Sequence, residues 1–158
     1  MSIVNTKTSN LARRLSNYIM VTEIKHLYVD NSSIPSSGKG LFTSKEISKG
    51  ELIIEYTGEI TTWEDVRHDA TNVYIYFVNE DHVINAKNFP DAIARYANDA
   101  HGLTRVKGLH NNSRFVKIDE KIFIKATKLI RAGSEILVDY GKDYWNTIRK
   151  NKELLKEK

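Results

Sequence analysis

Four short segments of the sequence contain polar or aromatic residues that can serve a ligand or a reaction, and three of the four also contain glycine. In chain order they are Gly38-Lys39-Gly40-Leu41-Phe42, Glu55-Tyr56-Thr57-Gly58-Glu59, Arg95-Tyr96-Ala97-Asn98 and Glu135-Ile136-Leu137-Val138-Asp139-Tyr140-Gly141. Glycine lets a ligand approach the backbone closely, because no side chain blocks it. Each segment alone is weak evidence, since Gly-x-Gly is usually a turn and Asp-Tyr-Gly can end any strand.

Metal chemistry is not expected. The chain has no cysteine, which excludes disulfides and cysteine-based zinc clusters. The segment 101–111 contains His101 and His110 beside Arg105 and Lys107, but no carboxylate or cysteine set stands at ligand spacing. We expect this segment to be a solvated surface loop, and we predict no metal site.

Short strands and glycine turns must position the four segments. The spacing of β-branched and aromatic residues predicts strands over 23–29, 40–42, 52–56, 73–78, 82–84 and 135–138, and a hairpin over 116–126. Helices are expected over 11–19, over 62–69 after the capping box Thr61-Thr62-Trp63-Glu64, over 92–98 and over 145–155. The pattern predicts a mainly β, β-rich α+β domain of several small sheets.

The bulk composition is that of one soluble domain. The 158 residues are 41% hydrophobic, enough for a single core, and no apolar run approaches the roughly 20 residues of a membrane span. The net charge of +4 is interpreted as a solubilising surface. Residues 1–20 show no signal peptide, and an N-terminal arm is preferred over a transit peptide. We expect a soluble intracellular protein.

Taken together in this order, the four segments resemble the motifs of SET-domain protein lysine methyltransferases. The resemblance spans residues 22–145 and is closest to the compact viral or bacterial type, which has no cysteine-rich flanking modules. It implies a SET fold, in which the C-terminal segment passes under a preceding loop in a knot-like way. The implied organisation is an arm over 1–21, the SET domain over 22–141 and a helical lid or tail over 142–158.

The resemblance implies in-line methyl transfer from S-adenosylmethionine to a lysine. A free lysine has a pKa of about 10.4, so its neutral amine costs roughly 4 kcal/mol near neutral pH. An apolar channel and the positive sulfonium both disfavour the ammonium and lower that pKa. Tyr140 is the implied catalytic residue, whose hydroxyl holds the amine. Implied cofactor contacts are Lys39, Gly40, Tyr74, Arg95, Asn98, Asp99, Tyr140 and Trp145.

Aromatic side chains suit the lysine channel, because they exclude water and tolerate a cationic amine. The implied channel residues are Tyr76, Phe115, Val138 and Tyr144. Tyr74, Tyr76 and Phe77 cannot all face one way along a strand, and we favour Tyr74 at the cofactor. Val138 stands where many members carry Phe or Tyr that limits the number of methyl groups, although Phe115 can fill the space instead. Asn98 also has a structural interpretation, as a helix-ending asparagine.

Two alternatives stay open. Asn98-Asp99-Ala100 replaces the family's Asn-His-Ser, which puts cofactor affinity in doubt and allows an inactive SET-fold binding module. Basic termini allow nucleic-acid binding, but they also contain Glu153 and Glu157, and no base-stacking platform is apparent, so this is not expected as the primary role. The expected partner is a protein substrate, a histone tail or another lysine-rich protein. An acidic groove for it is expected from Glu51, Glu55, Glu59, Glu64, Asp65, Glu80 and Asp81.

Overall fold

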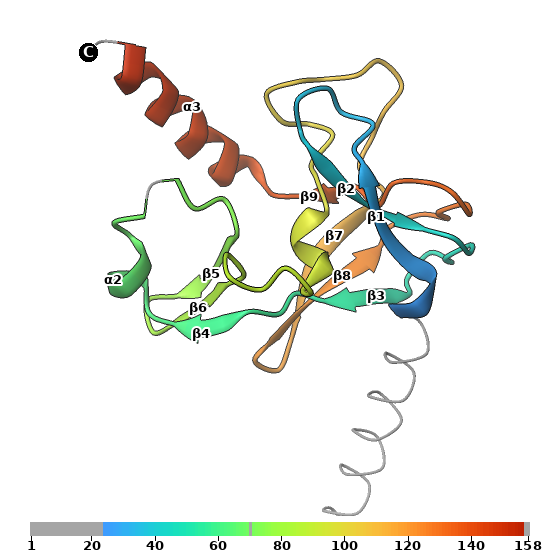
Figure 1. Cartoon of the computed structure of the whole chain (residues 1–158), viewed down its shortest axis with the longest axis horizontal. Helices are drawn as coiled ribbons and strands as arrows, with labels where there is room; N and C mark the ends of the chain where they lie inside the picture. Colours follow the sequence, from blue (N-terminus) through green and yellow to red (C-terminus); the bar gives the residue numbers. More distant parts are fainter. Residues whose placement is uncertain (1–23, 70, 157–158) are drawn as a thin grey trace, which may run out of the picture.

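Strands dominate the molecule, and they form three small sheets (Figure 1). The computed structural model describes residues 24–69 and 71–156. The first sheet pairs β1 (Leu27–Asn31) with β2 (Lys39–Thr43). The second has the order β3 (Leu52–Glu55), β8 (Lys121–Ala126), β7 (Ser113–Ile118) and β9 (Val138–Asp139). The third has the order β4 (Glu59–Thr61), β6 (His82–Asn85) and β5 (Ile75–Asn79). The predicted β-rich fold class is confirmed.

The helices are few and mostly short. They are the 3-10 turns η1 (Ile24–His26) and η2 (Ile93–Tyr96), the one-turn helix α2 (Trp63–Val66) and the C-terminal helix α3 (Lys142–Lys156). Figure 1 shows α3 projecting away from the β-rich body. No helix in residues 24–69 and 71–156 is long and apolar enough to cross a membrane.

One core joins the sheets. β3 and β8 carry consecutive apolar residues that are buried, as expected for a strand covered on both faces, and they pack with Leu41, Ile84 and Ile136. Burying a side chain of this size contributes about 1.5–3 kcal/mol. This core holds the strands and the turn η2 (Ile93–Tyr96) that carry the four sequence segments.

The segment before Tyr140 is hydrogen-bonded on both sides. Ile136 N donates to Leu41 O at 2.7 Å, and Val138 N donates to Asn98 O at 2.8 Å. On the other flank, Ser113 N donates to Leu137 O at 3.0 Å, and β9 runs parallel to β7. Three segments that lie far apart in sequence, around residues 40, 98 and 140, therefore meet here.

Several predicted boundaries were wrong, each for a local reason. The strand expected over 23–29 is the turn η1 followed by β1, because pairing with β2 begins only at Leu27. The helix expected over 62–69 ends at Val66, and its N-cap is Thr62, whose Oγ1 accepts from Asp65 N at 3.3 Å. The strand expected over 135–138 is reduced to Val138–Asp139, because residues 135–137 bond different partners one by one.

Three further elements differ from the prediction or cannot be compared with it. β4 was not predicted, because three residues are too few for an alternating pattern to indicate a strand. α3 begins three residues earlier than the helix expected over 145–155. The helix expected over 11–19 lies outside the described residues.

Candidate active site

Tyr140 lies directly after β9, and its position is fixed at both ends. Its hydroxyl donates to Ala97 O at 2.6 Å, and its backbone N donates to Asp99 Oδ2 at 3.0 Å. Gly141, which follows, has φ of 89°, a left-handed conformation that glycine adopts without strain. The chain can therefore turn sharply from β9 into α3 while the tyrosine ring stays over residues 97–99.

Six aromatic rings from five parts of the chain form one continuous aromatic cluster. They are Tyr56, Tyr76, Phe115, Tyr140, Tyr144 and Trp145. The rings of Tyr76 and Phe115 lie 4.8 Å apart, and those of Phe115 and Tyr140 lie 6.3 Å apart. The ring of Trp145 stacks on the ring of Tyr140 with their centres 5.8 Å apart. The ring of Tyr144 meets the Tyr140 ring edge-on, with the centres 5.0 Å apart. An assembly of this kind excludes water and presents faces that attract a cation.

The tyrosines of this cluster are held in their neutral form. Burial raises the pKa of Tyr140 and of Tyr56 far above the ordinary value of 10.0, and the neighbouring Tyr144 adds to both shifts. Burial likewise raises the pKa of Tyr76 and Tyr144. The positive charge of Arg95 works against the shift at Tyr56. Near neutral pH these hydroxyls can therefore donate and accept hydrogen bonds but do not ionise.

Asn98 joins two of the four sequence segments. Its Nδ2 donates to Lys39 O at 2.8 Å and to Glu135 Oε1 at 3.3 Å. Glu135 is buried and also accepts from Ser33 N at 2.7 Å. A side chain at Gly40 would collide with this carboxylate, so glycine is required there by close packing. The backbone of Lys39 and Gly40 is thereby placed beside Asn98.

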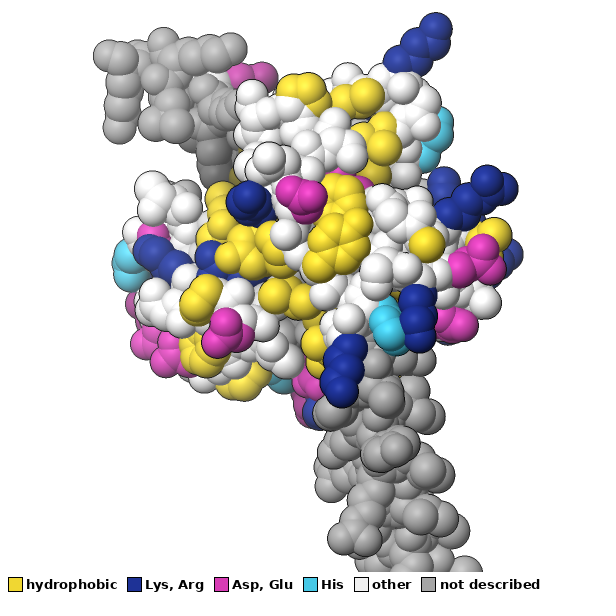
Figure 2. All heavy atoms as spheres, turned by 45° about the vertical axis from the view of Figure 1, so that its right-hand side comes forward, with side chains coloured by type: hydrophobic (Ala, Val, Ile, Leu, Met, Phe, Trp, Pro, Cys, Tyr) yellow, Lys and Arg dark blue, Asp and Glu magenta, His cyan; other side chains and the backbone are white. Residues whose placement is uncertain are grey.

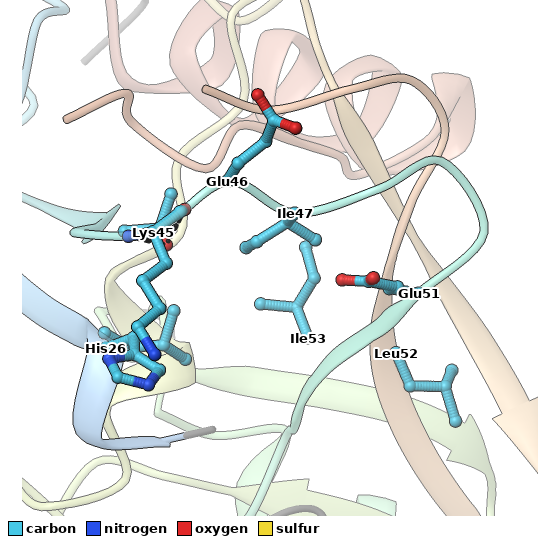
Figure 3. Close-up of a pocket in the computed structure, with 9 residues that line it drawn as sticks. His26, Lys45, Glu46, Ile47, Glu51, Leu52 and Ile53 are labelled. Carbon is cyan, nitrogen blue, oxygen red and sulfur yellow. Dashed lines mark hydrogen bonds between the residues drawn. The ribbon is translucent and has the colours of Figure 1, made fainter. Parts of the chain in front are cut away.

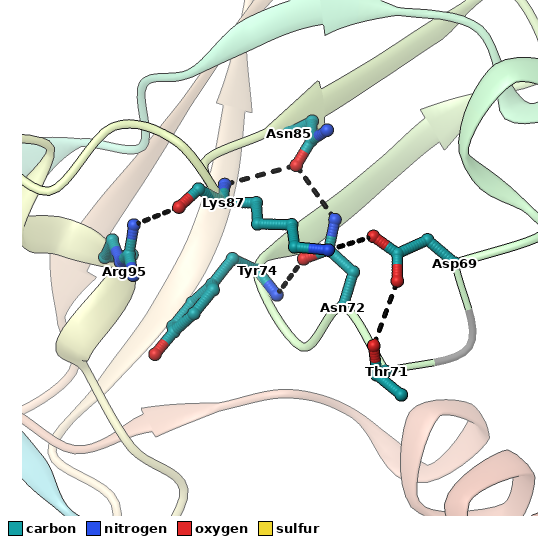
Figure 4. Close-up of polar contacts among 7 residues, drawn as sticks. All are labelled: Asp69, Thr71, Asn72, Tyr74, Asn85, Lys87 and Arg95. Atoms are coloured by element: carbon teal, nitrogen blue, oxygen red, sulfur yellow. Dashed lines mark hydrogen bonds and ion pairs between the residues drawn. The ribbon is translucent and has the colours of Figure 1, made fainter.

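Arg95 lies against Tyr74 at the start of β5. The guanidinium carbon is 3.8 Å from the centre of the Tyr74 ring, and Nη1 donates to Ala86 O at 2.6 Å and to Lys87 O at 2.9 Å. Figure 4 shows how Tyr74 is presented: its backbone N donates to Asn72 Oδ1 at 3.0 Å. The cation and the ring thus hold each other beside the aromatic cluster.

Asp99 is 5% exposed, and both of its carboxylate oxygens point into the protein. Four neutral donors surround them, from His101 and Asn111 on one oxygen and from Tyr140 and Trp145 on the other. The residue that breaks the family's motif is therefore fully hydrogen-bonded.

Other candidate residues differ in their surroundings. Val138 is fully buried on β9, in the same core cluster as Tyr56, against which Tyr76, Phe115 and Tyr140 pack. The Lys39 side chain turns away to Asn31 Oδ1 at 3.0 Å. Glu51, expected in an acidic groove, lines a separate hollow of about 360 Å³ with His26 and Ile53 (Figure 3). That hollow contains no other candidate residue.

Sequence reasoning overlooked two residues of this region. Tyr56 belongs to the second sequence segment, yet we did not single out its ring, which lies 5.9 Å from both Tyr76 and Phe115. Glu135 opens the fourth segment, and its burial beside Gly40 was not expected. The sequence did contain a signal for Tyr56. It is the aromatic residue of the second segment, which otherwise has the polar and glycine residues that end a strand. In residues 24–69 and 71–156 no group of three metal-binding side chains occurs.

Comparison with known proteins gives a consistent result. The SET domain family model matches residues 38–141. Histone-lysine N-methyltransferase trr of Drosophila melanogaster is 30% identical over 125 residues, which cover 75% of this chain and 5% of that protein. N-lysine methyltransferase KMT5A-A of Xenopus laevis is 24% identical over 119 residues, which cover 68% of this chain and 34% of that protein. The chain thus spans about a third or less of the length of these relatives.

The fold comparison agrees. The solved methyltransferase domain of human PR domain-containing protein 2 superposes with a TM-score of 0.57 at 24% identity, covering 80% of this chain and 84% of that chain. At this identity the likeness concerns the fold.

Proposed function

Because this chain belongs to the SET-domain family of lysine methyltransferases, we propose that it transfers a methyl group from S-adenosylmethionine to a lysine side chain of a protein. One observation carries the proposal. Tyr140 is one of the six rings of the aromatic cluster, and its neutral hydroxyl donates to the backbone oxygen of Ala97, the residue before Asn98.

The residues present suit this cofactor. Both hydrogen bonds of the Asn98 side chain use its amide nitrogen, so within the described part of the chain Oδ1 is not engaged and suits an ammonium donor. The faces of Tyr140 and Trp145 suit a sulfonium, as aromatic faces suit other cations. We propose that Lys39, Gly40, Tyr74, Arg95, Asn98, Tyr140 and Trp145 hold the cofactor.

When bound, S-adenosylmethionine supplies a methyl group on a positive sulfur, which the lysine nitrogen accepts as the methyl–sulfur bond breaks and a proton leaves to water. The protein's part is to present a neutral, aligned amine. The aromatic cluster excludes water, which disfavours the charged ammonium. The positive charge of Arg95, which is close enough to lower the pKa of Tyr56, also disfavours a charged ammonium in the site.

Tyr140 positions the amine rather than removing its proton. A tyrosine whose pKa is raised by burial holds its own proton tightly, and the Tyr140 proton is directed to Ala97 O. The hydroxyl oxygen keeps lone pairs that can accept an N–H from the lysine. Alignment of well-placed reactants is worth up to about 7–11 kcal/mol.

The charge distribution supports a basic protein substrate. Residues 55–85, which run from the end of β3 through β4, α2, β5 and β6, carry seven acidic side chains and one arginine, whereas the whole chain has a net charge of +4. Exposed carboxylates of this region include Glu59, Glu80 and Asp81, and Tyr76 of the aromatic cluster lies on β5. Complementary charge of this kind steers partners and fixes their orientation. We propose a histone tail or another lysine-rich protein.

Nucleic-acid binding is less well supported. On the face shown in Figure 2, Lys and Arg side chains stand apart from one another and do not join into one basic patch. The inactive binding module was suggested by Asp99, and the four hydrogen bonds of that residue favour an ordered site over this alternative.

The test is incubation of the purified protein with S-adenosylmethionine carrying a labelled methyl group and a panel of histones and other basic proteins. We expect label on a lysine that mass spectrometry can locate. Tight binding of cofactor and substrate with no transfer to any of them would instead identify a binding module.

A further inference from the structure

We propose that Asp99 is a positioning residue of this site, which holds the backbone of Tyr140 and the indole of Trp145 to the loop 101–111. The inference rests on the proposed function, since it concerns how that site is aligned. Asp99 makes these contacts through a carboxylate, at a position where the family's motif has histidine.

The contacts are short and come from both sides. Asp99 Oδ2 accepts from Trp145 Nε1 at 2.7 Å and from Tyr140 N at 3.0 Å. Asp99 Oδ1 accepts from Asn111 Nδ2 at 2.7 Å and from His101 N at 2.8 Å. One buried side chain thus links the end of β9, the first turn of α3 and the loop 101–111.

A carboxylate is the side chain that fits these four contacts. All four partners are N–H donors, and an ionised carboxylate offers only acceptors. The orientation of the Asn111 amide is set independently, because its Oδ1 accepts from Ala100 N at 2.8 Å. An amide at position 99 would turn an NH2 group toward two donors, whichever way it faced.

Trp145 has little freedom once this bond is made. Its ring stacks on Tyr140 at an interplanar angle of 11°, and a Cβ added to Gly102 would lie 2.7 Å from the far edge of the indole. The partly exposed indole is therefore contacted by Tyr140, the backbone at Gly102 and the carboxylate. Through it, Asp99 sets where α3 begins to cover the aromatic cluster.

The central experiment uses Asp99→Asn and the pair Asp99→Asn/Asn111→Asp. The chain has two tryptophans, so it gives two indole N–H signals in a proton–nitrogen NMR spectrum, and Trp63→Phe assigns them. In Asp99→Asn we expect the Trp145 signal to move upfield, the melting temperature to fall by about 3 °C or more, and kcat to fall about tenfold or more. The KM for the cofactor should change less than kcat because, of the seven residues proposed to hold the cofactor, only Tyr140 and Trp145 donate hydrogen bonds to Asp99.

The double variant reverses the direction of the hydrogen bond between residues 99 and 111. The amide introduced at position 99 can donate to the carboxylate introduced at position 111, while the amide oxygen still faces Tyr140 and Trp145. We expect the double variant to recover part of the Trp145 signal shift and part of kcat. Asp119→Asn is the matched control, since it makes the same chemical change at an exposed residue of the β7–β8 turn whose φ of 54° suits asparagine.

The proposal is overturned if Asp99→Asn keeps the Trp145 signal and kcat of the Asp119→Asn control. It is also overturned if Asp99→Asn lowers kcat with the Trp145 signal unmoved. A wild type that transfers no methyl group would sink the proposed function instead. The NMR signal and the melting temperature would still decide whether Asp99 holds Trp145.

Discussion

The hydroxyl of Tyr140 donates a 2.6 Å hydrogen bond to the backbone oxygen of Ala97, across 43 residues of sequence. This bond joins the third and fourth sequence segments directly. It also leaves the lone pairs of the tyrosine oxygen as acceptors, which the proposed mechanism uses for the substrate amine.

Removing only that oxygen should separate catalysis from packing. In Tyr140→Phe the ring remains stacked on Trp145, so we expect the free energy of unfolding to fall by about 1 kcal/mol. Turnover should drop by about 10²-fold or more, as when a positioned polar group is lost from a transition state, with cofactor affinity within a few-fold. Methyl incorporation measures turnover, and calorimetry measures cofactor affinity. Equal turnover in both proteins would remove Tyr140 from the mechanism.

Cofactor binding should depend on Asn98. S-adenosylmethionine at about 100 times its Kd would stabilise the wild type by ~2.7 kcal/mol, seen as a higher melting temperature. Asn98→Ala should lose most of that shift, because the side chain that links Lys39 and Glu135 is gone. Asn79→Ala, at the exposed end of β5, is the control and should keep the shift. A folded wild type with no shift at millimolar ligand would refute the cofactor assignment.

The number of methyl groups added should depend on Phe115, whose ring lies among Tyr56, Tyr76 and Tyr140. Phe115→Leu reduces the bulk there while keeping an apolar side chain. We expect mass spectrometry of the product to show a larger fraction of the more highly methylated lysine. Phe77→Leu makes the same change on β5, in the third sheet, where the ring is 49% exposed. An identical product distribution in both variants would show that Phe115 does not limit the space.

Alkaline pH should destabilise the fold through its buried tyrosines. The folded-state pKa of Tyr56 lies above the ordinary 10.0, so the folded protein holds this proton more tightly than the unfolded chain does. Its contribution to stability is complete below about pH 10 and is lost as the pH rises above that value, by at most ~1.4 kcal/mol per pH unit.

Urea midpoints measured from pH 8 to about pH 11 should therefore fall less steeply for Tyr56→Phe than for the wild type. Tyr28→Phe, at a tyrosine that is 39% exposed on β1, should follow the wild-type slope. Parallel slopes in all three proteins would argue against burial of the Tyr56 hydroxyl as the cause.

The sequence alone was sufficient for the family, the β-rich class and most of the local elements. The hairpin of β7 and β8 and the helix α3 follow from residue alternation and from helix-forming residues, which are properties of neighbours along the chain. The four sequence segments likewise stand in order in the printed sequence, and their resemblance to SET motifs needs no structure.

Only the tertiary structure decided which donors and acceptors meet. Asp99 looked like a defect because it replaces the histidine of the family's motif. Three of its four partners lie 12, 41 and 46 residues away, and no local pattern pairs such residues. Tyr56 joined the aromatic cluster for the same reason, through the packing of three separate strands. A burial environment is created by the fold as a whole, so the role of a buried carboxylate or hydroxyl is set by long-range contacts rather than by residue type.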